Sequence, residues 1–276
     1  MHHGHPFWSW QLLLAMALNC VVQGFTIANY AARLAGARSG RVATAISLYN
    51  MFATASRFAG MIYTPMLGSL SDRAGLTGDV HGFLWQLRFI VFAGTFGAVL
   101  GTLALPTFVV VYIRAIRAFE RVRNIPKAAI RVFIPKTALS LLRDVKLTVA
   151  TNPWKLSVKH VPKDVLVLNT LVTMVYGIGI VSAAYASVLN PGAARTALLF
   201  SGLVNGIGAI AFNVVVDPTA AFITDQTVRG ERNIDDVKAL VTYLSFTAIL
   251  GFLLSQVLLV PAAYVLKAAS QLVTGR

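Results

Sequence analysis

Long runs of apolar residues, separated by shorter polar and basic segments, dominate the hydropathy pattern of this chain. Six runs reach the length of about 20 residues that an α-helix needs to cross a bilayer. They cover residues 8–30, 42–70, 87–113, 165–189, 196–216 and 240–266. They are too long and too uniformly apolar for barrel strands, which alternate over roughly 10 residues. The pattern predicts an all-α integral membrane protein with six transmembrane helices.

Composition supports this fold class. Of the 276 residues, 57% are hydrophobic and only 12% are charged, about half the charged fraction of a soluble domain. The amino-terminal segment lacks the basic region of a signal peptide, so we expect the first run to be a retained span. The single cysteine, Cys20, excludes an internal disulfide and a multi-cysteine metal site.

Basic residues cluster in three segments, which predicts an orientation in the membrane. Residues 114–163 carry twelve lysines and arginines against Glu120 and Asp144, and the other clusters are Arg33, Arg38, Arg41 and Arg229, Arg232, Lys238. By the positive-inside rule all three segments are cytoplasmic and both termini lie outside. The net charge of +14 is then an orientation signal that suits anionic inner-leaflet lipids, and nucleic-acid binding is disfavoured.

The basic segment divides the chain into residues 1–113, 114–163 and 164–276. Within it, apolar residues recur at helical spacing from Ile134 to Val149, a pattern typical of a helix lying in the membrane interface. We interpret residues 114–163 as a cytoplasmic, interfacial connector between two halves, in preference to a gate or a docking site.

An internal repeat relates these halves. An offset of 155 residues aligns Tyr30 with Tyr185, Asn50 with Asn205 and Pro106 with Pro261, and an offset of 153 aligns Pro65 with Pro218 and Asp72 with Asp225. Three spans per half would insert the second half upside down. Inverted repeats are a transporter architecture, with the substrate site between the repeats near the bilayer midplane. The second span is longer than the hydrocarbon core, so it must tilt, break or extend beyond it. Gly60 and Pro65 offer one position for a break, and Gly206, Gly208 and Pro218 offer another in the fifth span.

Arg57 lies deep within the second apolar run. An ionisable residue at membrane depth is by default a functional-site hypothesis, and the planar fork of a guanidinium suits a phosphate. The alternatives are a snorkelled side chain or a structural ion pair with Asp217, Asp225 or Asp72. The sequence leaves these alternatives open.

Other polar residues in the spans are weaker candidates. Asn50, Asn205 and Asn213 are suited to binding a sugar or peptide, although hydrogen bonds between helices are the favoured interpretation. Asp217, Asp225 and Asp72 are candidates for coupling to a proton or sodium ion, and a solvated loop is favoured for Asp225. Tyr30 is a candidate contact or, like Tyr63 and Tyr185, an interfacial anchor. We interpret Gly94, Gly97 and Gly101 as positions of close helix packing.

Enzyme signatures are absent from the sequence. There is no G-x-x-x-x-G-K-[ST] phosphate-binding loop and no H-E-x-x-H zinc motif. We therefore expect no enzymatic activity, no metal and no cofactor.

The segment R-L-A-G-A-R-S-G-R at residues 33–41, followed by A-I-S-L-Y-N and the stretch around Arg57, resembles the Amj family of bacterial lipid II flippases, which substitute for MurJ. The likeness extends to overall length and six spans. It implies movement of undecaprenyl-pyrophosphate-linked disaccharide-pentapeptide to the outer leaflet of the bacterial inner membrane, for cell-wall synthesis. On this basis we hypothesise that Arg33, Arg38 and Arg41 collect the pyrophosphate and that Arg57 carries it inward.

Two alternatives stay open from the sequence. One is a transporter of another prenyl-linked glycan or a phospholipid, and the other is a non-transporting scaffold for envelope assembly. A lateral polar cleft that reaches Arg57 would distinguish a transporter from a scaffold. Assembly into a homo-oligomer is not decided by the sequence.

Overall fold

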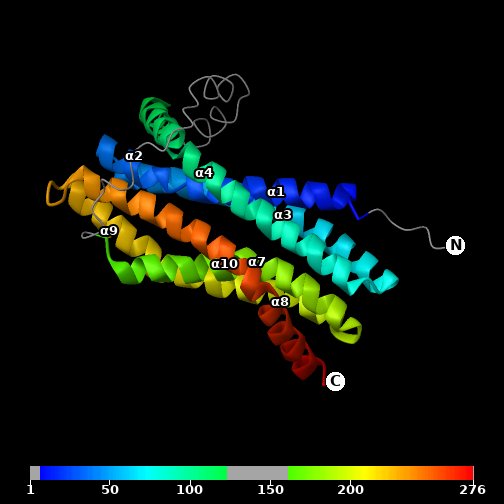
Figure 1. Ribbon diagram of the computed structural model, residues 1–276. Helices are drawn as coiled ribbons and strands as arrows, with labels where there is room; N and C mark the ends of the chain where they lie inside the picture. The colour runs from blue at the N-terminus through cyan, green and yellow to red at the C-terminus, as the bar shows by residue number, and fades with distance from the viewer. Residues whose placement is uncertain (1–6, 123–160, 276) are drawn as a thin grey trace.

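The computed structural model describes residues 7–122 and 161–275, apart from the side chains of Arg57, Arg121 and Val122. Within these ranges every regular element is a helix (Figure 1). The helices are α1 (Trp10–Ala28), α2 (Ala31–Ser39), α3 (Val42–Thr77), α4 (Val80–Val122), α7 (Lys163–Leu189), η3 (Pro191–Ala193), α8 (Ala194–Ala211), the π-helix η4 (Phe212–Val216), α9 (Asp217–Val228) and α10 (Ile234–Thr274).

Five helical stretches are long and apolar enough to cross a membrane: Trp10–Ser39, Val80–Glu120, Lys163–Leu189, Pro191–Val228 and Ile234–Thr274. The chain is thus an α-helical membrane protein. The remaining long helix, α3, has 36 residues but is more polar, because Asn50, Ser56 and Thr64 lie along one side of it.

In the first half, α1 packs closely along α4. A Cβ atom at Gly97 would overlap the Cys20 carbonyl oxygen, and one at Gly101 would overlap that of Gly24. At Gly94 it would lie 2.6 Å from Asn19 Nδ2, which donates a 2.8 Å hydrogen bond to the Ile90 carbonyl. The prediction that these three glycines permit close helix packing is confirmed.

We expect Gly97→Ala to destabilise the protein by about 1–3 kcal/mol, because the added methyl group forces α1 and α4 apart. The measurement is the unfolding free energy in mixed micelles. Gly75→Ala is the matched control, since no atom lies within 4 Å of a Cβ placed at Gly75. Equal stability of the two variants would contradict the close packing.

The second half repeats this pairing with α7 and α10. A Cβ atom at Gly251 of α10 would lie 2.6 Å from the Thr170 carbonyl oxygen of α7. The halves also meet directly, because Arg88 Nη1 donates to the Gln256 carbonyl at 3.2 Å and Gln256 Nε2 donates to the Arg88 carbonyl at 2.9 Å. Two tightly packed helix pairs therefore form the centre of the molecule, joined through α4 and α10.

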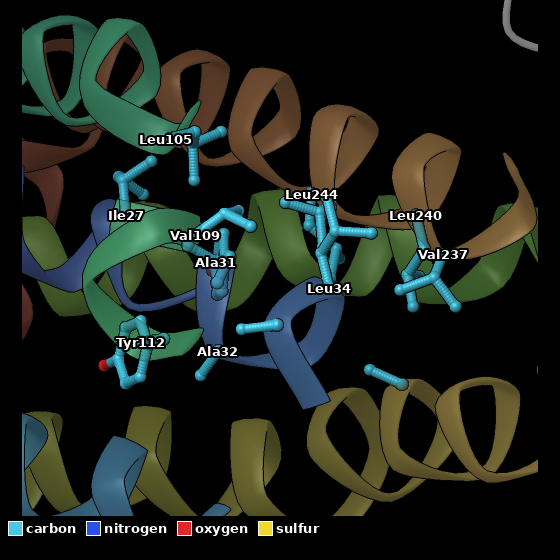
Figure 2. Packing of buried hydrophobic residues seen from close by; sticks show 14 of the residues in the cluster. Ile27, Ala31, Ala32, Leu34, Leu105, Val109, Tyr112, Val237, Leu240 and Leu244 are labelled. Carbon is cyan, nitrogen blue, oxygen red and sulfur yellow. The ribbon is translucent and has the colours of Figure 1, made fainter. Parts of the chain in front are cut away.

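The basic residues Arg33, Arg38 and Arg41 after the first span suggest a solvated turn in the sequence, but the structure has a largely buried helix there, α2, so that interpretation is wrong. Its first six residues are all buried, because small side chains let it pack between α4 and α10. Figure 2 shows the cluster, in which α2 contributes Ala31, Ala32 and Leu34, and α4 and α10 contribute Leu105, Val109, Tyr112, Val237, Leu240 and Leu244. Helix α2 ends at Gly40, whose φ of 66° is a left-handed conformation that favours glycine.

Two of the basic segments lie at one end of the molecule, and the described start of the third lies there as well, as the sequence predicts. In Figure 1 the α2–α3 junction, the end of α4 and the α9–α10 junction lie on the left, whereas the α3–α4 and α7–α8 junctions lie on the right with the start of α1 and the end of α10. The start of the predicted connector, residues 114–163, differs from the expectation, since α4 extends into it as far as Val122. The predicted interfacial helix at 134–149 lies outside the described residues.

The predicted helix breaks are only partly present. Helix α3 continues through Gly60 and Pro65, and α8 continues through Gly206 and Gly208, so no break occurs at these positions. Helices α4 and α10 likewise continue through Pro106 and Pro261. Prolines are tolerated in transmembrane helices when neighbouring groups satisfy the freed carbonyl. The fifth span is irregular, because the π-helix η4 ends at Val216, two residues before Pro218. The interpretation of Tyr30, Tyr63 and Tyr185 as interfacial anchors is also wrong, since all three are buried.

Candidate substrate site

A cavity of about 510 Å³ lies between the two halves. Residues of α1, α3, α7, α8 and η4 form most of its wall, and Phe252 of α10 contributes as well. Its volume is within the range of about 300–1,000 Å³ typical of small-molecule sites. The space between the two halves, where the repeat hypothesis places a substrate site, therefore contains a cavity.

The described wall of this cavity combines an apolar majority of its surface with polar and aromatic side chains, and it carries no formal charge. Amide side chains project from α1 and its C-terminal cap, from α3, from α8 and from η4, and hydroxyl groups and aromatic rings complete the surface. The amides and hydroxyl residues are Asn19, Gln23, Asn29, Asn50, Asn205, Asn213, Thr26, Ser56, Thr64, Thr173 and Ser201, with Tyr30, Tyr49, Tyr63, Tyr176, Phe212 and Phe252. A dense set of hydrogen-bonding groups within apolar helices suits a polar ligand that must be shielded from lipid.

Asn50, Asn205 and Asn213 all line the cavity. Among the described residues, none of these three side chains forms a hydrogen bond with another helix. Their interpretation as interhelical hydrogen-bonding residues is therefore wrong. Asn205 Oδ1 is buried without a partner there. Their role in substrate binding stays a prediction.

Helices α3 and α8 flank the cavity and pack against α1 and α7, with little contact between each other. Their other faces carry exposed large apolar residues: Phe58, Ile62, Leu199, Leu203, Ile207 and Ile210. Such faces are typical of lipid contact. Helices α3 and α8 thus border the cavity without packing closely on each other.

Arg57 occupies the cavity-lining stretch of α3 by its register. The residues one turn before and one turn after it, Ala53 and Gly60, both line the cavity, and residues three or four apart share a helix face. The side chain of Arg57 itself lies outside the described part of the structure, so the pyrophosphate-carrying role stays a hypothesis.

An ion pair joins the halves at the basic end. Arg33 of α2 pairs through Nη2 with Asp217 Oδ1, the first residue of α9. The Arg33 side chain is only 7% exposed and that of Asp217 is 34% exposed. The guanidinium carbon also lies 5.8 Å from the ring centroid of Tyr49, a cation–π contact. Asp217 is therefore the partner of Arg33, and Arg33 is not a freely accessible collecting residue.

The ion pair lies next to the cavity. Tyr49 lines both the cavity and a small pocket of about 20 Å³ that also contains Arg33 and Asp217. Tyr30 stacks on Phe212 at a centroid distance of 6.5 Å, and its hydroxyl donates to Asn169 Oδ1 at 3.2 Å. The stacked rings and the ion pair thus mark the boundary of the cavity toward the basic end.

The other predicted residues lie outside the cavity. Arg38 is exposed on α2, and Arg41 forms a 2.6 Å pair with Glu120 on the surface. Asp225 pairs with Arg229 at 2.7 Å, and Asp72 is exposed near the end of α3. The structure brings Arg33, Asp217, Tyr30, Asn50 and Asn205 together. It places Arg38, Arg41, Asp225 and Asp72 outside this group.

The cavity is also lined by Asn19, Gln23 and Asn29, which were not predicted from the sequence. The available signal was their occurrence as amides inside the first apolar run. Gln23 Nε2 donates to Asn19 Oδ1 at 3.2 Å, and Asn29 Oδ1 accepts from the Tyr112 hydroxyl at 2.8 Å. These residues are therefore held in place by α1 and α4, the most tightly packed pair of the first half.

The fold and the cavity define a helical membrane protein. Its site carries polar groups, lies between two groups of helices and is flanked by α3 and α8. The family model described as Amj, Alternate to MurJ, matches residues 18–270, and the chain belongs to this family. It is 32% identical over 266 residues to lipid II flippase Amj of Bacillus subtilis (strain 168), a match that covers 92% of this chain and 94% of that protein. No solved structure matches the chain.

Proposed function

We propose that this protein is a lipid II flippase, which moves the undecaprenyl-pyrophosphate-linked peptidoglycan precursor from the cytoplasmic to the outer leaflet of the bacterial inner membrane. The observation that carries the proposal is the 32% identity to a lipid II flippase along 92% of the chain. The family match over residues 18–270 includes every residue that lines the cavity. Flipping a lipid requires no chemical step, so the proposed function is that of a transporter and not of an enzyme.

The shape of the site supports this function. A flippase must shield a polar headgroup while the prenyl chain remains in lipid. The cavity supplies polar groups, and the sparse contact between α3 and α8 gives a lateral route for the chain. A scaffold would need neither feature.

We infer six crossings and two inverted repeats. Helix α3 packs along α1 and returns the chain from the α2 end to the start of α4 (Figure 1), so it spans the same depth. The pairing of α1 with α4 matches that of α7 with α10, and α1 and α7 run in opposite directions in Figure 1. These features support halves at 1–113 and 164–276 that alternate access to the cavity.

The basic end is the proposed cytoplasmic end, with both termini outside. Exposed Arg38 and Arg41 lie at this end of the molecule, as does the Arg33–Asp217 ion pair at the boundary of the cavity. The pair of Arg41 with Glu120 is a surface pair, whose contribution to stability is small, so a phosphate can displace Glu120. We propose that Arg38 and Arg41 attract lipid II and anionic lipids, and that Arg33 and Arg57 receive the pyrophosphate deeper in the protein.

Expression of the chain is expected to restore growth of bacteria depleted of their other lipid II flippases. Arg57→Ala should abolish rescue and Arg57→Lys should restore it only in part, because an ammonium keeps the charge but not the planar fork. The measurements are colony formation and lipid II translocation in vesicles, with protein level as a control. Full rescue by both variants would remove Arg57 from the site, and absence of rescue by the wild-type chain would contradict the function.

A further inference from the structure

The two halves make a similar contact near each end of the molecule, and the internal repeat relates the two contacts. The basic-end contact joins residues 30–34 to residues 217–225, and the far-end contact joins residues 185–189 to residues 64–72. The offset of 155 aligns Y-A-A-R-L at 30–34 with Y-A-S-V-L at 185–189, and the offset of 153 aligns 64–72 with 217–225. Each contact therefore combines one segment from each half, as inverted repeats predict.

The two contacts differ in charge. At the far end the buried Ser71 and Ser187 hydroxyls form a hydrogen bond of 2.6 Å, and at the basic end Arg33 pairs with Asp217. In the far-end contact the repeat places uncharged residues at both positions of the ion pair, Val188 and Thr64. Only the basic-end contact of this related pair is therefore held by charges that an anion can disrupt.

Arg33 connects three helices at the basic end. Its Nη2 pairs with Asp217 of α9, and its guanidinium carbon lies 5.8 Å from the ring centroid of Tyr49 on α3. Asp217 is the more exposed partner, at 34% against 7% for Arg33, so another anion can compete with its carboxylate. A pyrophosphate offers several charged oxygens, to which a guanidinium can donate two parallel hydrogen bonds. It is therefore a suitable replacement for Asp217 as the partner of Arg33.

We propose that Asp217 stands in for the pyrophosphate of the substrate, and that exchange of the two anions on Arg33 opens the basic-end contact while the far-end contact stays closed. This inference rests on the proposed function and deepens it, because it makes Asp217 a positioning residue for substrate entry. The exchange frees Arg33 from α9 and loosens its contact with Tyr49 of α3. Since Tyr49 lines both the cavity and the pocket of the ion pair, the headgroup then continues into the cavity, toward Arg57.

Cysteine labelling at two repeat-related positions tests the exchange. In a Cys20→Ser parent, which lacks the single cysteine of the sequence, Thr224→Cys reports on the basic-end contact and Ser71→Cys on the far-end contact. The offset of 153 aligns these residues, and they are 1% and 5% exposed, so they are a matched pair. The readout in nanodiscs is the ratio of labelling rates by a water-soluble maleimide with and without added lipid.

Lipid II should accelerate labelling of Thr224→Cys at least about fivefold, because labelling follows the population of the open contact, and should leave Ser71→Cys unchanged. Undecaprenol, which lacks the pyrophosphate, should change neither rate. Equal acceleration at the two positions would overturn the exchange, as would an unresponsive Thr224→Cys protein that still flips lipid II in vesicles.

Asp217→Asn tests the ion pair without any substrate. It leaves the buried Arg33 without an ionic partner, which disfavours the closed contact, so Thr224→Cys should react at least about fivefold faster without lipid II, and lipid II should add little. Asp217→Glu, which keeps the charge, should restore slow labelling and its response to lipid II. Unchanged labelling in Asp217→Asn, or equally faster labelling of Ser71→Cys, would overturn the proposal. A wild-type protein that flips no lipid II would overturn the proposed function and the exchange with it.

Discussion

Gly60→Trp is expected to slow lipid II flipping by at least about tenfold, equivalent to about 1.4 kcal/mol added to the barrier, without unfolding the protein. Gly60 lines the cavity, and no atom lies within 4 Å of a Cβ placed there. The indole would therefore occupy the space that the headgroup needs instead of colliding with a neighbouring helix.

A matched variant separates blockage from general disturbance. Gly68 lies about two turns further along α3 and is not part of the cavity wall, and a Cβ atom at Gly68 would also have no neighbour within 4 Å. Gly68→Trp should therefore flip lipid II at the wild-type rate in the same proteoliposome assay. Equal activity of the Gly60→Trp and Gly68→Trp proteins would show that the substrate does not use the cavity.

Asp217→Leu is expected to lower the unfolding free energy by about 3–5 kcal/mol, because it leaves the buried Arg33 guanidinium without its partner. Arg33→Met should cost less, since the Asp217 side chain that remains is 34% exposed and keeps part of its hydration. The measurement is unfolding in mixed micelles, and Arg38→Met on the exposed side of α2 is the control.

The double variant Arg33→Met/Asp217→Leu distinguishes a structural pair from a functional one. Replacement of a whole buried ion pair by apolar residues is often neutral for stability, so the double variant should regain most of the lost stability. We expect it to remain inactive in flipping, because the phosphate-binding donor is gone. Recovery of flipping together with stability would assign the pair a purely structural role.

The helices and their close contacts were predictable from sequence because they depend on local pattern. Apolar runs gave the long helices, and the glycines of α4 indicated where α1 approaches. Helix α2 was not predicted, since Arg33, Arg38 and Arg41 resemble a solvated turn. The contrary signal was the run of small residues Ala31, Ala32, Ala35 and Gly36, which allows burial between two larger helices.

The ion pair between Arg33 and Asp217 could not be predicted from the sequence. Arg33 and Asp217 are 184 residues apart, and several carboxylates near span ends were equivalent candidates for any buried arginine. Gln23 and Asn19 were individually visible as amides in an apolar run, but only the packing of α1 on α4 fixes their orientation, through the hydrogen bond from Asn19 Nδ2 to the Ile90 carbonyl. Conversely, the offset of 155 residues did relate Asn50 to Asn205, and the two side chains line one cavity from different helices.

The glycine contacts that bring α1 against α4 and α7 against α10 leave those pairs no room to slide. They are best suited to act as a static frame. Helix α8 is held on α7 in the same way, since a Cβ atom at Gly179 would overlap Asn205 Oδ1, whereas Cβ atoms at Gly60, Gly68 and Gly75 of α3 would have no neighbour within 4 Å. The moving part of this transporter is therefore expected to be α3, which tilts against the frame to expose the cavity wall to one leaflet and then to the other.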